Sequence, residues 1–106
     1  MILYIMYHKI NLMFNKFLKR NINQNEFNLI NNQIKNKTFH FDNLLKNILH
    51  SKEFGLLCLQ NISNIFKSID YDIKTIKESI IKNLVKQMQN GTSIDKIKTN
   101  ILCNFN

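Results

Sequence analysis

The chain has no proline and only two glycines in 106 residues, and this shortage of turn-forming residues limits what it can fold into. A β-sandwich or a small barrel needs turn signals about every 8–12 residues, and the sequence lacks them. The hydrophobic content of 44% is too high for a disordered tail. Collagen-like and disulfide-framework folds also fail on composition. The sequence therefore predicts an all-α fold.

Apolar residues recur at helical spacing along the whole chain. In the first segment, for example, Ile10, Phe14 and Leu18 fall on one face, with lysines off that face. The last three residues, 104–106, are expected to fray. The pattern predicts five to six helices, over residues 2–19, 24–36, 42–50, 52–69, 73–89 and 94–103.

Polar residues at the expected helix ends fit capping positions. Asp42 and Ser51 are natural N-caps, because their side-chain oxygens can accept hydrogen bonds from free backbone N–H groups. Thr75 and Glu78 have the spacing of a capping box. Gly91 follows the fifth helix and suits the left-handed position just beyond a helix C-terminus.

A chain of 106 residues can build one small hydrophobic core, so we expect a single domain. Residues 33–38 (Gln-Ile-Lys-Asn-Lys-Thr) and 87–92 (Gln-Met-Gln-Asn-Gly-Thr) are alike, and an Asp and then Asn-Ile-Leu follow each of them. We interpret them as an internal repeat, with a first copy over about 14–54 and a degenerate second copy over about 66–103. Such a repeat predicts two related helical hairpins packed around one core.

The formal net charge is +8, from 14 lysines, one arginine and seven acidic residues. A basic surface attracts polyanions such as nucleic acid or an acidic membrane. The abundance of Lys, Asn and Ile also follows A+T-rich codons, so the charge has a simpler explanation. The single arginine weakens nucleic-acid recognition, because lysine lacks its bidentate contacts. The polar side of the fifth expected helix carries Lys74, Lys77, Lys82 and Lys86. These lysines form either a stripe that faces a polyanion or a solvated face.

No pattern of catalytic, cofactor-binding or metal-binding residues is present in the sequence. His8, His40 and His50 are far apart, whereas zinc ligation needs four converging nitrogen or sulfur ligands. Cys58 and Cys103 both have apolar neighbours, which favours buried structural thiols. We expect no catalytic residue, no cofactor, no metal and no small-molecule substrate.

The apolar run over residues 2–7 is too short to span a bilayer, and it lacks the order of a signal peptide. The first 25 residues hold four bases and no acid, which resembles a transit peptide weakly; a helix packed on the core is the favoured interpretation. The sequence indicates no transmembrane segment and leaves the compartment open.

Residues 14–54 carry a helical repeat pattern. Phe14 and Arg20 fit its opening, Phe27 fits its second helix, and Ser-Lys-Glu-Phe at 51–54 fits its close. This pattern resembles a bacterial helical repeat family of unknown function that is similar to the linker domains of phycobilisomes. The second copy, over 66–103, matches more weakly.

The first copy departs from that family where Ile22 and Asn23 replace Pro-Asp and where Lys37 replaces glycine. The resemblance implies an all-helical module without known catalysis, in exported, surface or carbohydrate-related proteins or as a scaffold of larger assemblies. We also expect Arg20 to form a charge-assisted hydrogen bond with Glu53 or Glu26 that ties the end of the first helix to the end of the third, with Phe54 filling the core beneath it. The structural motif residues are Phe14, Arg20, Phe27, Asp42, Ser51, Glu53, Phe54 and Gly91.

These observations favour a non-enzymatic helical interaction or scaffold module that binds another protein. The alternative is a small basic RNA-binding component of a ribonucleoprotein, such as an organellar ribosome, which the charge of +8 suggests. A small immunity-type or antitoxin-type binder is a further possibility, and an enzyme is the least favoured class.

Overall fold

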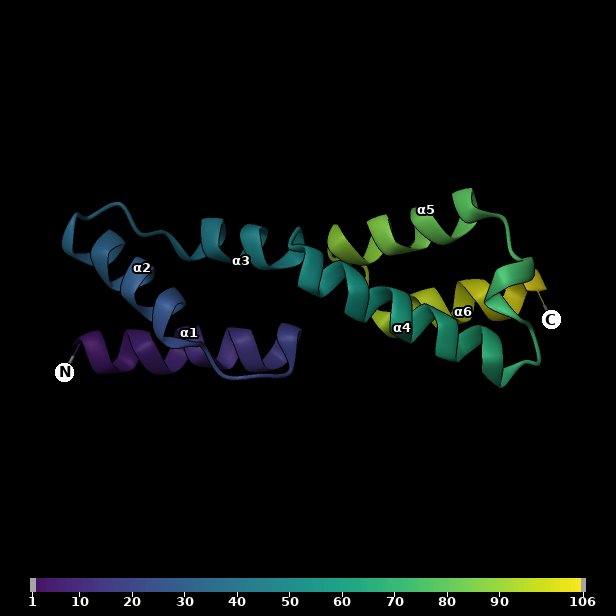
Figure 1. Cartoon of the computed structure of the whole chain (residues 1–106), viewed down its shortest axis with the longest axis horizontal. Coiled ribbons are helices and arrows are strands. Elements are labelled where there is room, and N and C mark those ends of the chain that lie inside the picture. Colours follow the sequence, from purple (N-terminus) through teal and green to yellow (C-terminus); the bar gives the residue numbers. More distant parts are fainter. Residues whose placement is uncertain (1, 106) are drawn as a thin grey trace. The chain divides into compact units, whose positions relative to one another are not determined.

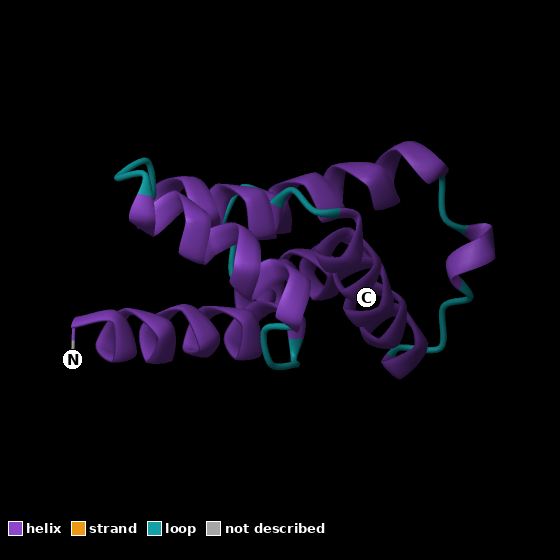
Figure 2. Cartoon of the chain, turned by 60° about the vertical axis from the view of Figure 1, so that its left-hand side comes forward, coloured by secondary structure: helices purple, strands orange, loops and turns teal. Residues whose placement is uncertain are grey.

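The computed structural model describes the backbone of residues 2–105 and the side chains of residues 4–105. Within this range the chain forms helices and loops and no strand (Figures 1 and 2). The predicted all-α fold of five to six helices is confirmed. The elements are α1 (Ile2–Leu18), α2 (Gln24–Lys35), α3 (Phe41–Leu49), α4 (Lys52–Ser68), the 3₁₀ helix η1 (Ile73–Thr75), α5 (Glu78–Gln89) and α6 (Ile94–Phe105).

The chain divides into two compact units, Met1–Ile48 and Leu49–Asn106. The buried side chains of the first unit are Ile10, Phe14, Leu18, Ile30 and Ile48. The second unit holds a contiguous buried cluster from α4, α5 and α6, namely Cys58, Ile62, Ile65, Phe66, Ile81, Leu84, Met88, Ile97 and Ile101. The packing of two related hairpins around one shared core stays a prediction.

Helix α4 is the centre of the second unit, because it packs against both α5 and α6 (Figure 1). Phe66 of α4 is fully buried, and its ring centroid lies 5.0 Å from that of Phe105, in an edge-to-face arrangement. Phe105 also contacts Tyr71 at 5.8 Å. The prediction that residues 104–106 fray is therefore wrong for the end of α6, where these aromatic contacts hold Phe105; Asn106 lies outside the described residues.

The two turns of the predicted repeat have the same backbone hydrogen bonds. After α2, the N–H of Lys37 donates to the carbonyl of Ile34 at 3.1 Å, and the N–H of Thr38 donates to that of Gln33 at 2.9 Å. After α5, residues 91 and 92 make the same two bonds, each at 3.0 Å. This is the Schellman arrangement, which needs a left-handed residue just beyond the helix.

Gly91 takes that left-handed position with φ 101°, as predicted. In the first turn Lys37 occupies this position at φ 58°. A residue with a Cβ thus adopts the left-handed conformation that glycine usually adopts. Lys19 and Asp70 adopt left-handed backbones after α1 and α4 as well. A chain with two glycines thus ends several of its helices on non-glycine residues.

The N-caps predicted from the sequence are confirmed only in part. Ser51 caps α4 as predicted, because its hydroxyl oxygen accepts the N–H of Phe54 at 3.1 Å. Asp42 is not an N-cap: α3 begins at Phe41, and Asp42 lies inside its first turn. The N–H of Leu44 donates to the carbonyl of His40 at 3.2 Å, which places the start of the helix ahead of the aspartate. The Phe41 ring packs edge-to-face on Phe39 at 4.9 Å.

The predicted capping box of Thr75 and Glu78 is also wrong. Asp72 accepts the N–H of Lys74 at 3.0 Å, and the Thr75 hydroxyl donates to the Asp72 carbonyl at 2.6 Å. These bonds close a 3₁₀ turn in place of the first turn of the expected helix 73–89, and α5 starts at Glu78 after Lys77, which makes no side-chain cap bond.

Candidate interaction surfaces

Arg20 makes the charge-assisted hydrogen bond that the sequence predicts, and Glu26 is its partner. The two guanidinium nitrogens and the two carboxylate oxygens pair at 2.8 Å each. Glu26 also accepts the N–H of Asn23 at 3.0 Å, while the Asn23 side chain accepts the N–H of Glu26 at 2.8 Å. These two bonds are a capping box at the start of α2, which sequence reasoning missed although the pattern Asn-x-x-Glu is visible at residues 23–26.

The Arg20 hydrogen bond is the main reason why the pKa of Glu26 is lowered from its ordinary value. The guanidinium also lies 5.5 Å from the centroid of the Phe14 ring, which is buried. The pair of Arg20 and Glu26 thus links the end of α1 to the start of α2. The expected tie to the end of α3 stays a prediction.

The other aromatic motif residues pack against side chains of their own units. Phe27 is half-buried and meets Tyr7 edge-to-face at 5.2 Å. Phe54 packs against the buried cluster of the second unit; its expected place beneath the Arg20 hydrogen bond stays a prediction. Glu53 lies in the first turn of α4, in the second unit.

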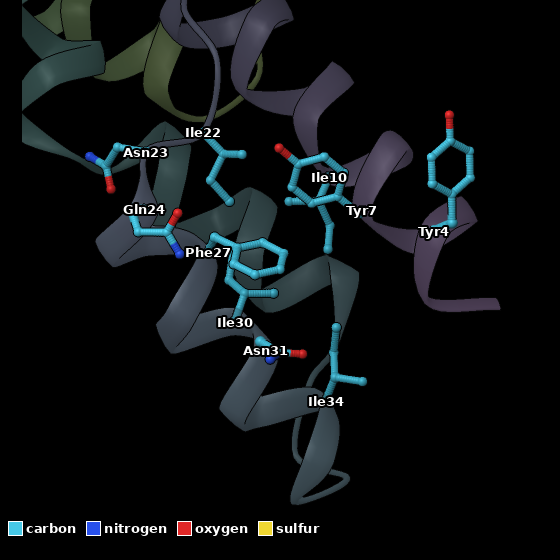
Figure 3. A pocket seen from close by; sticks show the side chains of 10 residues that line it. All are labelled: Tyr4, Tyr7, Ile10, Ile22, Asn23, Gln24, Phe27, Ile30, Asn31 and Ile34. Atoms are coloured by element: carbon cyan, nitrogen blue, oxygen red, sulfur yellow. The ribbon is translucent and has the colours of Figure 1, made fainter. Parts of the chain in front are cut away.

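Helices α1 and α2 enclose an open cavity of about 520 Å³ in the first unit. Figure 3 shows Ile10, Phe27 and Ile30 pointing toward one another, with Tyr4 standing apart near the start of α1. Aliphatic, aromatic and amide side chains line the cavity, and none of the lining residues is charged. No motif in the sequence marks this cavity, because its lining comes from ordinary apolar stripes.

A longer apolar groove lies in the second unit between α4 and the segment formed by η1 and α5. It consists of two adjoining hollows of about 420 and 520 Å³, which share Leu56, Leu59, Glu78 and Ile81. We call it the α4–α5 groove. Its lining residues are Lys52, Gly55, Leu56, Leu59, Gln60, Ser63, Asn64, Ile73, Lys74, Ile76, Glu78, Ile81, Lys82 and Val85.

Two leucines of this groove are exposed although helical spacing puts them in an apolar stripe. The spacing of apolar residues over 52–69 predicts a stripe with Leu56, Leu59 and Ile62 in it, but Leu56 and Leu59 are 58% and 38% exposed. Residues 56–59 are all apolar, so they surround a full turn of helix. Two of the four must therefore face away from the core that holds Cys58.

The four lysines expected on one helix face are divided between elements. Lys74 lies in η1 and Lys77 precedes α5, whereas Lys82 and Lys86 lie within α5. Lys74 and Lys82 line the groove, and Lys82 pairs with Glu78 at 3.1 Å. All four side chains are exposed.

The cysteines differ from each other. Cys58 is fully buried as predicted, and desolvation raises the pKa of its thiol to about 11. The prediction is wrong for Cys103, which is exposed near the end of α6. Among the described residues, no group of three His, Cys, Asp or Glu side chains could hold a metal ion. None of the helices within residues 2–105 is both long and apolar enough to cross a membrane.

Comparisons with family models, with curated proteins and with solved structures gave no match to this chain. The resemblance to linker-like helical repeats stays a prediction.

Proposed function

We propose that the protein is a non-enzymatic helical interaction module that binds another protein. The observation that carries this proposal is the exposure of Leu56 and Leu59, at 58% and 38%, in an apolar groove. Exposed apolar surface of this kind marks interaction sites. Full burial of an exposed leucine side chain contributes about 1.5–3 kcal/mol. Because Leu56 and Leu59 are each already partly covered, a partner that covers both gains about that much in total, which is part of what a micromolar affinity requires.

A scaffold role, as in linker-like repeats, is consistent with this proposal. The apolar cavity between α1 and α2 offers a further surface in the first unit, where Tyr4 and Leu29 are 74% and 62% exposed. A protein with two such surfaces can contact two partners at once.

The second candidate is a small RNA-binding component of a ribonucleoprotein. The net charge of +8 and the exposed side chains of Lys74, Lys77, Lys82 and Lys86 favour it. RNA bound in this way would be released steeply by salt, since binding to phosphates displaces counterions.

One experiment separates the two candidates. The tagged protein is purified from its native cells with and without ribonuclease, and any stoichiometric protein is identified, expressed and mixed with the pure chain. A one-to-one complex that survives ribonuclease supports the protein-binding module. Loss of every stoichiometric protein on ribonuclease treatment, together with binding of poly(U) that falls steeply between about 50 and 200 mM salt, overturns it in favour of the RNA-binding component.

A further inference from the structure

We propose that the α4–α5 groove binds an acidic amphipathic helix of another protein. This inference rests on the proposed function and names the surface and the chemistry of the partner.

The floor of the groove is aliphatic. Helix α4 contributes two exposed leucines. Half-buried or buried side chains come from η1, from α5 and from Ile76, which lies between these two elements. Aliphatic side chains of this kind accept the apolar face of a partner helix rather than a polar ligand. The floor residues are Leu56, Leu59, Ile73, Ile76, Ile81 and Val85.

The length of the groove fits a short helix. Along α4 its lining runs from Lys52 to Asn64, which is about 18 Å at the helical rise of about 1.5 Å per residue. A partner helix of about three turns spans that distance. Its anchor side chains at i, i+3 or i+4 and i+7 would enter the two hollows of about 420 and 520 Å³ in turn.

The charge of the lining selects an acidic partner. Lys52, Lys74 and Lys82 line the groove, and Glu78 is the one acidic residue among the lining side chains. The pair of Lys82 and Glu78 is 73% and 81% exposed, and such exposed pairs hold their partners weakly. Carboxylates flanking the apolar stripe of a partner helix would meet these lysines and steer its approach.

The same charges disfavour two other occupants. A second copy of this chain carries a net charge of +8, so it would bring lysines toward lysines. Nucleic acid could contact the lysines, but the lining holds no aromatic side chain on which a base could stack, and phosphates would leave the aliphatic floor uncovered.

The test uses the full chain, isotope-labelled for NMR, and three probes. The first is a synthetic 14-residue amphipathic helix with leucines at i, i+3, i+7 and i+10 and glutamates beside them. The second has lysine in place of every glutamate, and the third is poly(U). We expect the acidic peptide to shift the signals of Leu56, Leu59, Ile81 and Val85, and to bind at least tenfold more tightly than the basic peptide.

Two variants test the floor. The double substitution Leu56→Gln and Leu59→Gln replaces exposed side chains, so the fold is retained, and we expect it to weaken binding of the acidic peptide about tenfold or more. Leu29→Gln is the matched control, because Leu29 is 62% exposed on α2 in the other unit, and it should leave the affinity within twofold.

Four results overturn the proposal: no binding of either peptide, equal binding of both, shifts confined to residues of the α1–α2 cavity, or the same groove signals moved by poly(U) or by self-association at high protein concentration. These results are distinct from a failure of the proposed function. If the native one-to-one complex forms equally well with the double glutamine variant, the groove inference fails while the proposed function stands.

Discussion

Replacing Lys37 by glycine is expected to stabilise the protein, although no contact is added. Lys37 occupies the left-handed position of the turn after α2 with φ 58°. In the equivalent turn after α5 the residue is Gly91, at φ 101°. The two turns make the same backbone hydrogen bonds, so they form a matched pair within one chain.

The magnitude follows from two opposing terms. A left-handed backbone costs an L-residue about 1–2 kcal/mol, and glycine avoids this cost. Glycine also loses more backbone entropy on folding, which takes back about 0.5–1 kcal/mol. The net stabilisation expected for Lys37→Gly is therefore about 0.5–1 kcal/mol. A Cβ added at Gly91 meets no atom within 4 Å, so Gly91→Lys should destabilise the protein by about the same amount, through the backbone alone.

The assay is urea unfolding followed by circular dichroism at the helical minimum. With a slope of about 1.5 kcal/mol per molar urea, the midpoint should rise by roughly 0.3–0.7 M for Lys37→Gly. It should fall by a similar amount for Gly91→Lys. Lys37→Ala is the control, since it removes the same charge and side chain but keeps a Cβ in the left-handed backbone.

If the Lys37→Gly variant is no more stable than the Lys37→Ala variant, the reasoning is refuted. Any gain in stability would then come from removal of the lysine charge and not from relief of the left-handed backbone. Tolerance of Gly91→Lys without any loss of stability would refute it as well.

Three further predictions concern other contacts. Arg20→Met should destabilise the protein by about 1 kcal/mol at pH 7; because the pKa of Glu26 is lowered by folding, this difference should shrink as the pH falls below the ordinary glutamate value of 4.5 and Glu26 becomes protonated in both variants. Asn23→Ala should cost about 1 kcal/mol in urea unfolding, through loss of the N-cap of α2. In the native protein a thiol reagent should modify Cys103, which is exposed, and spare Cys58, which is buried with a thiol pKa of about 11.

Each of these has its own control. An effect of Arg20→Met that does not change between pH 7 and pH 3 would show that the ion pair is not its source. Asn25 lies within the first turn of α2, and Asn25→Ala should be neutral or slightly stabilising. An equal loss of stability in Asn25→Ala and Asn23→Ala would contradict the capping role of Asn23. Modification of two thiols per chain before unfolding would contradict the burial of Cys58.

Much of the helical architecture follows from the local sequence. The spacing of apolar residues identifies the six α-helices found within residues 2–105. Ser51 and Gly91 mark two of their ends, since caps and turns depend on hydrogen bonds between residues three to five apart. The likeness of residues 33–38 and 87–92 predicts the shared turn for the same reason. Because the chain has few residues that interrupt helices, apolar spacing and capping residues are enough to predict most of its secondary structure.

Packing between distant segments decided the rest. Phe105 belongs to α6 because Phe66 and Tyr71 hold its ring, and no local pattern predicts that contact. The same holds for α4, where the apolar run 56–59 covers every direction around the helix. That run by itself favours no face, and the packing of α4 against α5 and α6 decides that Cys58 is buried while Leu56 and Leu59 line an open groove.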